Sequence, residues 1–414
     1  MLTRRTYFDD DAGAKGYRLG THRTVSPHAT LARADPHLGA MGITRIANVT
    51  GLDKLGIPVV MVCRPNSRSI SVSQGKGVEL AAAQASGVME AVETYHAERI
   101  TLPLKFAAFD ELRHAHPMVD VTKLPFAVES RYRSDRALLW IEGRNLMNDE
   151  PLWLPHELVH TDYTLPQPTG SGCFSANTNG LASGNHILEA IAHGLYEVIE
   201  RDAITLWRLQ RKTTGGQPLN LASVNDHSCR ALFERFECAD IDVRVWNVTS
   251  DVGVACFFCL VMGRQEDDTE PEFGSGCHPV REVALLRALT EAAQARTTYI
   301  AGSRDDFTAE IYSAAARAER TYACRELLAS QAHEQNFEEV PSFESDTLWE
   351  DISWTLGRLE AVGVTQVAVV DLAQERFRIP VARVVIPGLE GVYKGEHSDY
   401  VAGARAGAVL RDRR

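Results

Sequence analysis

Apolar and polar positions repeat with two periods along this chain, and the change of period separates predicted strands from predicted helices. Residues 43–51, 57–65 and 68–77 are short apolar runs bounded by turn-forming residues, which predicts three strands. Residues 78–100 then carry apolar side chains at helical spacing, and long helical patterns recur at 186–210 and 280–302. Each of these three predicted helices follows a turn rich in Gly, Asn or Ser.

The rest of the chain alternates between shorter elements. We expect strands near 137–146, 151–155, 241–249, 254–263, 365–373 and 382–388, and helices near 227–237 and 354–363. The expected fold class is α+β, with mixed, mainly antiparallel sheets packed on three long helices. Residues 1–41 are polar and weakly periodic, so we expect a poorly structured lead-in. A single composite domain is expected over 42–395 and a polar tail over 396–414.

Composition narrows the class of protein. The 414 residues include 44% hydrophobic positions, enough for a large core and too many for a disordered chain. The formal charge of −12 argues against a broad nucleic-acid-binding surface, which is normally basic. No apolar run is long enough for a membrane-spanning helix, and the N-terminus lacks the apolar segment of a secretory signal. A cytoplasmic protein without membrane or nucleic-acid partners is therefore expected.

Eight cysteines offer little evidence for a metal centre. Cys256 and Cys259 form the one C-x-x-C pair, within an apolar run that predicts a strand, and no second pair lies at zinc spacing. We interpret them as buried free thiols. Cys277 and His278 complete a metal site with that pair only if the fold brings them together, so a role for Cys256, Cys259 and Cys277 stays open.

Polar residues on the three long predicted helices are few, and they align. Ser86, Glu90 and Glu93 are spaced i, i+4 and i+7, which places them on one helix face. The second helix aligns Asn185, Glu189, Glu197, Glu200 and Arg201, and the third aligns Arg287, Glu291, Gln294 and Arg296. Charged faces of helices are commonly solvated, which is the simpler interpretation. Here the flanking positions are mostly apolar, which favours buried carboxylates that need a partner, a cation or a proton.

The turns before these helices add a second observation. Helix N-termini after Gly-rich turns bind anions, carboxylates bind Mg²⁺, and Mg²⁺ and arginine bind phosphates. The pattern therefore indicates a magnesium–nucleotide site lined by helices. It is neither a P-loop, because G-x-x-x-x-G-K-[ST] is absent, nor a Rossmann site, because no G-x-G-x-x-G opens a helix after a strand.

Taken together, these residues resemble the YcaO family of ATP-dependent enzymes that modify peptide backbones. The resemblance covers about residues 45–391. It is carried in chain order by G-K-G at 75–77, S-x-x-x-E-x-x-E at 86–93, T-N-G-L-A-S-G-N-x-x-x-E at 178–189, E-x-x-E-R at 197–201, R-A-L-T-E-A-x-Q-x-R at 287–296 and I-P-G-L-E-G at 386–391. Any one of these motifs is weak, whereas their shared order over most of the chain is specific.

The resemblance implies roles for particular residues. The magnesium ligands would be five carboxylates: Glu90, Glu93, Glu189, Glu197 and Glu200. The nucleotide or phosphate contacts would be Lys76, Ser86, Asn185, Arg201 and Arg287, with Gln294 and Arg296 assigned less firmly. Thr94 departs from the pattern, because some members have arginine there, and one phosphate contact is therefore in doubt.

The resemblance also implies a chemistry. A nucleophile adds to a peptide carbonyl, ATP phosphorylates the resulting oxygen, and phosphate leaves. Azoline-forming members often end in a proline-rich tail, which the terminal residues here lack. We therefore expect the stand-alone type that works with a TfuA-like partner and an external sulfur donor to make a thioamide. A homodimer is expected from the same resemblance.

Two other functions stay open. One is an azoline-forming cyclodehydratase that acts on Cys, Ser or Thr of the substrate with a separate leader-binding partner. The other is a non-catalytic ATP-binding accessory protein, which degenerate carboxylates would favour, although all five are present. His186, His193 and His278 lie beside the motifs and are interpreted as capping or packing residues.

Overall fold

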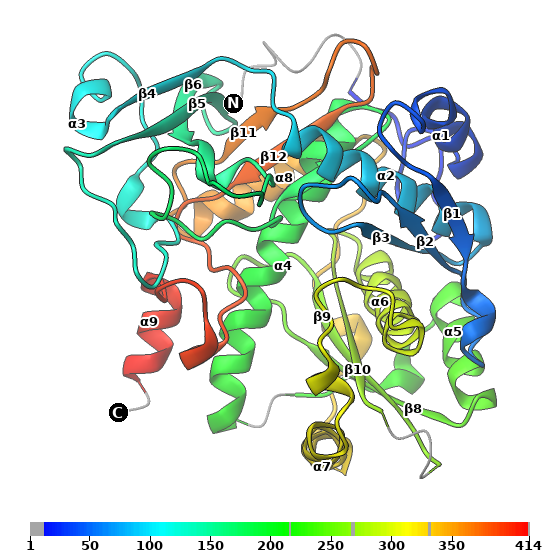
Figure 1. Ribbon diagram of the computed structural model, residues 1–414. Helices are drawn as coiled ribbons and strands as arrows, with labels where there is room; N and C mark the ends of the chain where they lie inside the picture. Colours follow the sequence, from blue (N-terminus) through cyan, green and yellow to red (C-terminus); the bar gives the residue numbers. More distant parts are fainter. Residues whose placement is uncertain (1–11, 215–216, 266–269, 330–332, 413–414) are drawn as a thin grey trace.

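The computed structural model describes residues 12–214, 217–265, 270–329 and 333–412. In these ranges the chain forms three antiparallel sheets around a long central helix (Figure 1). The expected α+β class, with antiparallel sheets and three long helices, is confirmed. No described helix combines the length and apolar character needed to cross a membrane.

The first sheet and its helix form one strand–helix unit. Strands β1 (Arg45–Asn48), β2 (Val59–Cys63) and β3 (Val72–Lys76) pair in chain order, and α2 (Leu80–Glu98) packs against β3 and β2. Gly75 makes this packing possible, since a Cβ there would lie 1.9 Å from the carbonyl oxygen of Ala83 on α2. The backbone of α2 is therefore in close contact with the backbone of β3, and this contact fixes the distance between the polar face of α2 and the sheet.

A second strand–helix unit repeats this arrangement later in the chain. After α5 (His227–Cys238), strands β8 (Ile241–Asn247), β9 (Cys256–Gly263) and β10 (Glu272–Cys277) pair in chain order, and α6 (Arg281–Ala301) packs on β10 and β9. Gly276 has the role of Gly75, because its Cβ would lie 2.1 Å from the carbonyl oxygen of Ala284.

The third sheet supports the central helix. Its strands are β4 (Leu104–Ala108), β5 (Ala137–Asn145), β6 (Glu150–Pro155), β7 (Leu181–Ser183), β11 (Ala368–Asp371) and β12 (Val381–Val385). Their order is β4-β5-β11-β12-β7, with β6 also paired to β5. Helix α4 (Ile187–Thr214) packs on β12 and β7 and also contacts β10. It therefore connects this sheet to the second unit, and α2 also contacts β7.

The shorter helices complete the molecule around this frame. They are α1 (Pro27–Ala34), α3 (Phe109–Leu112), α7 (Ala314–Ala329), α8 (Leu348–Ala361) and α9 (Ala404–Arg411). Helices α8 and α9 both pack on α4. Within the polar tail, α9 is fixed by Arg405, whose guanidinium pairs with the buried Asp202 of α4 at 2.9 Å.

The expected poorly structured lead-in is wrong for residues 12–41, while residues 1–11 lie outside the described ranges. Lys15 forms a buried ion pair with Asp351 of α8 at 2.7 Å, and Ser26 caps the N-terminus of α1. Arg33 donates to the backbone oxygen of Asn185 at 2.6 Å. The contacts of Lys15 and Arg33 reach distant parts of the chain, and all three contacts are polar, so a search for apolar periodicity does not detect them.

Candidate functional site

A cavity of about 600 Å³ lies between α2, α4 and α6, and residues 19–30 of the N-terminal segment also line it. Eleven of the twelve residues predicted for the site line this cavity. They are Lys76, Ser86, Glu90, Glu93, Asn185, Glu189, Glu197, Glu200, Arg201, Arg287 and Gln294. The polar face that the helical spacing predicts on each of the three long helices thus contributes to the wall of one cavity.

Two carboxyl groups of α2 are held in the cavity with few partners. Glu90 accepts one long hydrogen bond, from the backbone N–H of Gln74 at 3.4 Å. Glu93 accepts from the backbone N–H and the hydroxyl of Ser183, at 2.9 and 2.8 Å. Burial raises the pKa of Glu90 to about 7 and that of Glu93 to about 8. Both groups therefore carry a proton for part of the time near neutral pH, and a cation that displaced it would relieve the cost of burial.

Glu197, Glu200 and Arg201 bring α4 into the same site. Arg201 lies 3.7 Å from Glu197 and 3.3 Å from Glu200. Burial raises the pKa of Glu197, and the negative charge of Glu200 adds to that effect. Burial alone would lower the pKa of Arg201, but the two glutamates raise it above its usual value. Arg201 is therefore permanently charged, and its single positive charge faces the two carboxyl groups of Glu197 and Glu200.

Glu291 of α6 belongs to the cavity although we did not assign it to the site. It pairs with Lys76 at 2.5 Å and accepts from Ser275 at 3.2 Å. Burial would raise the pKa of Glu291, but Lys76 and Arg201 lower it below its usual range. Lys76, predicted to contact phosphate, thus has a carboxylate partner here. The sequence did contain a sign of Glu291, because it shares the helical spacing of Arg287 and Gln294.

Glu189 is the most fully hydrogen-bonded of the predicted magnesium ligands. It accepts from the hydroxyl of Thr24 at 2.6 Å and from the backbone N–H of Asn185 at 2.7 Å. Thr24 belongs to the N-terminal segment, so Glu189 ties that segment to the start of α4. Arg23 next to it lines the cavity as well, and no motif indicated it.

Several buried polar atoms in the cavity lack a protein partner. The Nε of Arg287, the Oδ1 of Asn185 and the Nε2 of Gln74 are in this state. Another arginine nitrogen, Nη2 of Arg287, lies 2.9 Å from Nε2 of His193. A bound nucleotide would give these polar atoms hydrogen-bond partners, and its magnesium ion would balance the charge of the neighbouring carboxylates. The residues present therefore fit a magnesium–nucleotide.

The structure places Arg296 elsewhere. Its Nε lies 3.0 Å from a carboxylate oxygen of Asp53, and both side chains are buried. Arg296 does not line the cavity. Arg296 is two residues after Gln294, and residues at this spacing lie on different faces of a helix. Arg296 can therefore belong to the sequence motif without belonging to the cavity.

The fold brings only two of the three candidate cysteines together: Cys277 lies opposite Cys256 in the β9–β10 pair, whereas Cys259 packs in another hydrophobic cluster. All three candidates are buried free thiols, as expected. Neighbouring strand residues alternate between sheet faces, so Cys256 and Cys259, three positions apart, enter different hydrophobic clusters. Burial raises the pKa of both thiols, which keeps them protonated.

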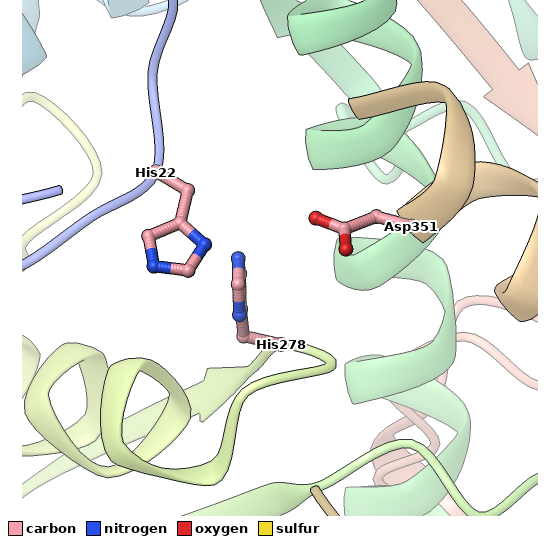
Figure 2. Close-up of side chains that lie close together, drawn as sticks. All are labelled: His22, His278 and Asp351. Atoms are coloured by element: carbon pink, nitrogen blue, oxygen red, sulfur yellow. The ribbon is translucent and has the colours of Figure 1, made fainter. Parts of the chain in front are cut away.

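Among the described residues, one group of three metal-type ligands does come together, and it includes His278. His22, His278 and Asp351 have ligand atoms within 4.8 Å of one another (Figure 2). Asp351 already pairs with Lys15, and both side chains are inaccessible to solvent or nearly so. Burial lowers the pKa of His22 to about 4. We therefore interpret this group as a tie between the N-terminal segment, the turn before α6, and α8.

Comparison with known proteins agrees with this geometry. The family model described as YcaO cyclodehydratase, ATP- and Mg²⁺-binding, matches residues 74–390. A protein from Rhizobium leguminosarum bv. trifolii, described as an uncharacterized protein in the tfuA 3′ region, is 35% identical over 93% of this chain and 92% of its own. An uncharacterized protein from Methanothermobacter thermautotrophicus is 35% identical over 89% of this chain and 95% of its own.

Solved structures share the fold. YcaO from Methanopyrus kandleri, determined with AMPPCP and Mg²⁺ bound, superposes with a TM-score of 0.74 at 22% identity, over 94% of this chain and 99% of that chain. A heterocyclase in complex with substrate and cofactor gives a TM-score of 0.76 at 22% identity, over 93% of this chain and 54% of that chain.

Proposed function

Because the chain belongs to the YcaO family of ATP-dependent, Mg²⁺-binding peptide-modifying enzymes, we propose that it forms a thioamide in a ribosomally made peptide or protein. In this proposal ATP activates a backbone amide, an external donor supplies sulfur, and a TfuA-like protein is the partner. The observation that carries the ATP-dependent activation step is the convergence of Glu90, Glu93 and Glu197 in one cavity, each with a raised pKa. Such carboxyls are poised to exchange a proton for a metal ion.

The residues divide into two groups in this proposal. Glu90, Glu93, Glu197 and Glu200 hold magnesium, with Glu189 assigned to the same set by family resemblance. Arg201, Arg287, Ser86 and Asn185 contact the nucleotide, and Gln294 and Lys76 complete the wall. Bound Mg²⁺ would neutralise part of the negative charge on the phosphate groups of ATP. The unpartnered Nε of Arg287 is free to donate to a phosphate oxygen.

Thioamide formation is supported by the relative from the tfuA region, which covers nearly the whole chain at 35% identity. Two alternatives from the sequence analysis are weighed against it. An azoline-forming cyclodehydratase is favoured by the wording of the family model and by the heterocyclase of similar fold. A non-catalytic accessory protein is disfavoured, because the cavity keeps every carboxylate of the motif. A homodimer and a cytoplasmic location remain part of the proposal.

The metal assignment is tested with Glu90→Gln and Glu200→Gln. Each removes one carboxylate charge with little change of shape, so we expect ATP turnover with peptide, sulfide and partner to fall by about 100-fold or more. Glu142→Gln is the matched control, since Glu142 is exposed on β5 away from the cavity. Phosphate release measures turnover, and Mg²⁺ titration of nucleotide binding locates the defect. Full activity in both cavity variants would show that the metal assignment is wrong.

Mass spectrometry of the product separates the two chemistries. Exchange of oxygen for sulfur raises the mass of the peptide and requires the sulfur donor. Cyclodehydration lowers the mass by one water, proceeds without sulfide, and requires Cys, Ser or Thr at the modified position. A water loss without sulfide would replace the thioamide proposal with the azoline alternative.

A further inference from the structure

A second cavity, of about 510 Å³, adjoins the first. The two share Thr178, Glu197, Arg201 and Arg304 in their walls, so they meet at the Glu197–Arg201 pair of α4. Beyond this pair the second cavity extends along β12 and the segment that follows it. None of its remaining wall residues was predicted for the site from the sequence.

Arg383 of β12 is the distinctive residue of this second cavity. The side chain is 2% exposed, yet its Nε and Nη1 atoms have no hydrogen-bond partner. Only Nη2 is engaged, donating to the backbone oxygen of Asn177 at 2.8 Å and lying 3.5 Å from its side-chain oxygen. Burial lowers the pKa of Arg383 to about 10. A buried guanidinium with two unused donors is costly unless a ligand completes it.

The charges around the second cavity favour an anionic ligand. Four cationic side chains line it against two carboxylates: Arg201, Arg304, Arg383 and Lys394 against Glu197 and Asp399. Arg201 pairs with Glu197, and Arg304 pairs with Asp306 at 2.6 Å. Among the described residues, Arg383 has no carboxylate within ion-pair distance. The carboxylate that acts on Arg383 from a longer distance is that of Glu197, whose charge would be shared with magnesium in the proposed function.

We propose that the second cavity receives the acceptor peptide and that Arg383 pairs with a carboxylate of that peptide. This inference rests on the proposed function and adds a specificity determinant to it. The shared wall at Glu197 puts peptide bound in the second cavity next to the nucleotide cavity. A neutral amide would satisfy the two free donors but would leave the buried charge uncompensated, which is why a carboxylate is preferred. The carboxylate is either the C-terminus of the peptide or an acidic side chain.

The experiment follows the Arg383 Nε–H signal by NMR in wild-type protein with ¹⁵N-labelled arginine. Arg383→Lys identifies the signal by its loss. If that variant does not fold, Asn177→Ala identifies the signal by a shift, because the substitution removes the side-chain oxygen that lies 3.5 Å from the same guanidinium. Four probes are titrated: N-acetyl-Gly-Gly with a free carboxylate, its C-terminal amide, N-acetyl-aspartate amide and inorganic phosphate.

We expect at least one of the two carboxylate probes to shift the Arg383 signal saturably and to bind about tenfold more tightly than the neutral amide. Which acid binds better tells whether a C-terminus or a side chain is recognised. Equal binding of acid and amide, no shift with either acid, or tighter binding of phosphate would each overturn the proposal. Binding of Mg-AMPPCP to the wild type is measured separately. Its absence would refute the nucleotide site, whatever the second cavity binds.

Discussion

Two buried carboxyl groups of the cavity, those of Glu93 and Glu291, are neutralised in different ways. Glu93 has no cationic partner and keeps a proton, because burial raises its pKa to about 8. Glu291 has Lys76 at 2.5 Å and keeps its charge. A metal ion at Glu93 would have to displace only a proton, whereas a metal ion at Glu291 would have to compete with the ammonium group of Lys76. Sequence spacing alone treats the two residues alike.

Arg296 gives a prediction at this scale. Its buried pair with Asp53 predicts that Arg296→Gln lowers the free energy of unfolding by about 3 kcal/mol, because the carboxylate is left buried without its cation. Nucleotide affinity per folded molecule should change less than about twofold, since Arg296 does not line the cavity. Urea denaturation and equilibrium nucleotide binding measure the two effects. A large loss of affinity with unchanged stability would return Arg296 to the nucleotide site.

At the scale of elements, close contact between strand and helix sets the position of the site. Gly75 allows α2 to lie on β3, and Gly276 allows α6 to lie on β10. The distance between these backbones leaves no room for a methyl group. Any side chain at these glycines has to push away the helix that carries the polar face, so stability and site geometry change together.

Gly75→Ala tests this packing. We expect a loss of about 3 kcal/mol or more in unfolding free energy, since a Cβ would meet backbone atoms of Ala83 and Gly87 at 1.9 and 2.2 Å. Gly357→Ala within α8 is the matched control, because nothing lies within 4 Å of its Cβ position, and alanine favours helix. That variant should gain about 0.5–1 kcal/mol. Similar stability changes in both variants would contradict the packing argument.

The sequence predicts the helices whose apolar residues recur at helical spacing. It does not predict the polar contacts between residues far apart in the chain. The predicted helices at 78–100, 186–210 and 280–302 are confirmed as α2, α4 and α6, because apolar periodicity is a local property. The same periodicity put Glu90, Glu197 and Arg287 on faces that meet in the cavity. Lys15 and Thr24 were missed, because their partners are far away in the chain and no pattern near them records the contact. Arg23 lines the cavity without a recognisable motif around it.

At the scale of the whole molecule, buried groups make stability depend on pH in opposite directions. Burial lowers the pKa of His156 to about 4, from 6.5. As the pH falls below 6.5, the unfolded chain binds a proton that the folded chain refuses, so this histidine lowers stability until about pH 4. Glu90 and Glu93 act the other way, because their raised pKa values let the folded state bind protons first.

His156→Gln isolates the histidine contribution. Between pH 7.5 and pH 5 we expect the variant to lose about 2 kcal/mol less unfolding free energy than the wild type. His114→Gln is the control, since His114 is exposed, and it should follow the wild-type pH dependence. Urea denaturation at the two pH values gives the difference. A pH dependence in His156→Gln equal to that of the wild type would show that this histidine takes up its proton as readily in the folded state.

The two strand–helix units also share a register. Gly75 and Gly276, Ser86 and Arg287, Glu90 and Glu291, and Glu93 and Gln294 are all separated by the same number of positions, and each pair has the same place in its unit. The two units therefore repeat one arrangement of strand, glycine contact and polar helix face. The cavity lies between two units of like construction, much as a site can lie between the subunits of a dimer. The first unit presents Glu90 to the cavity, while the second pairs Glu291 with Lys76 of the first, so the Lys76–Glu291 ion pair links the units.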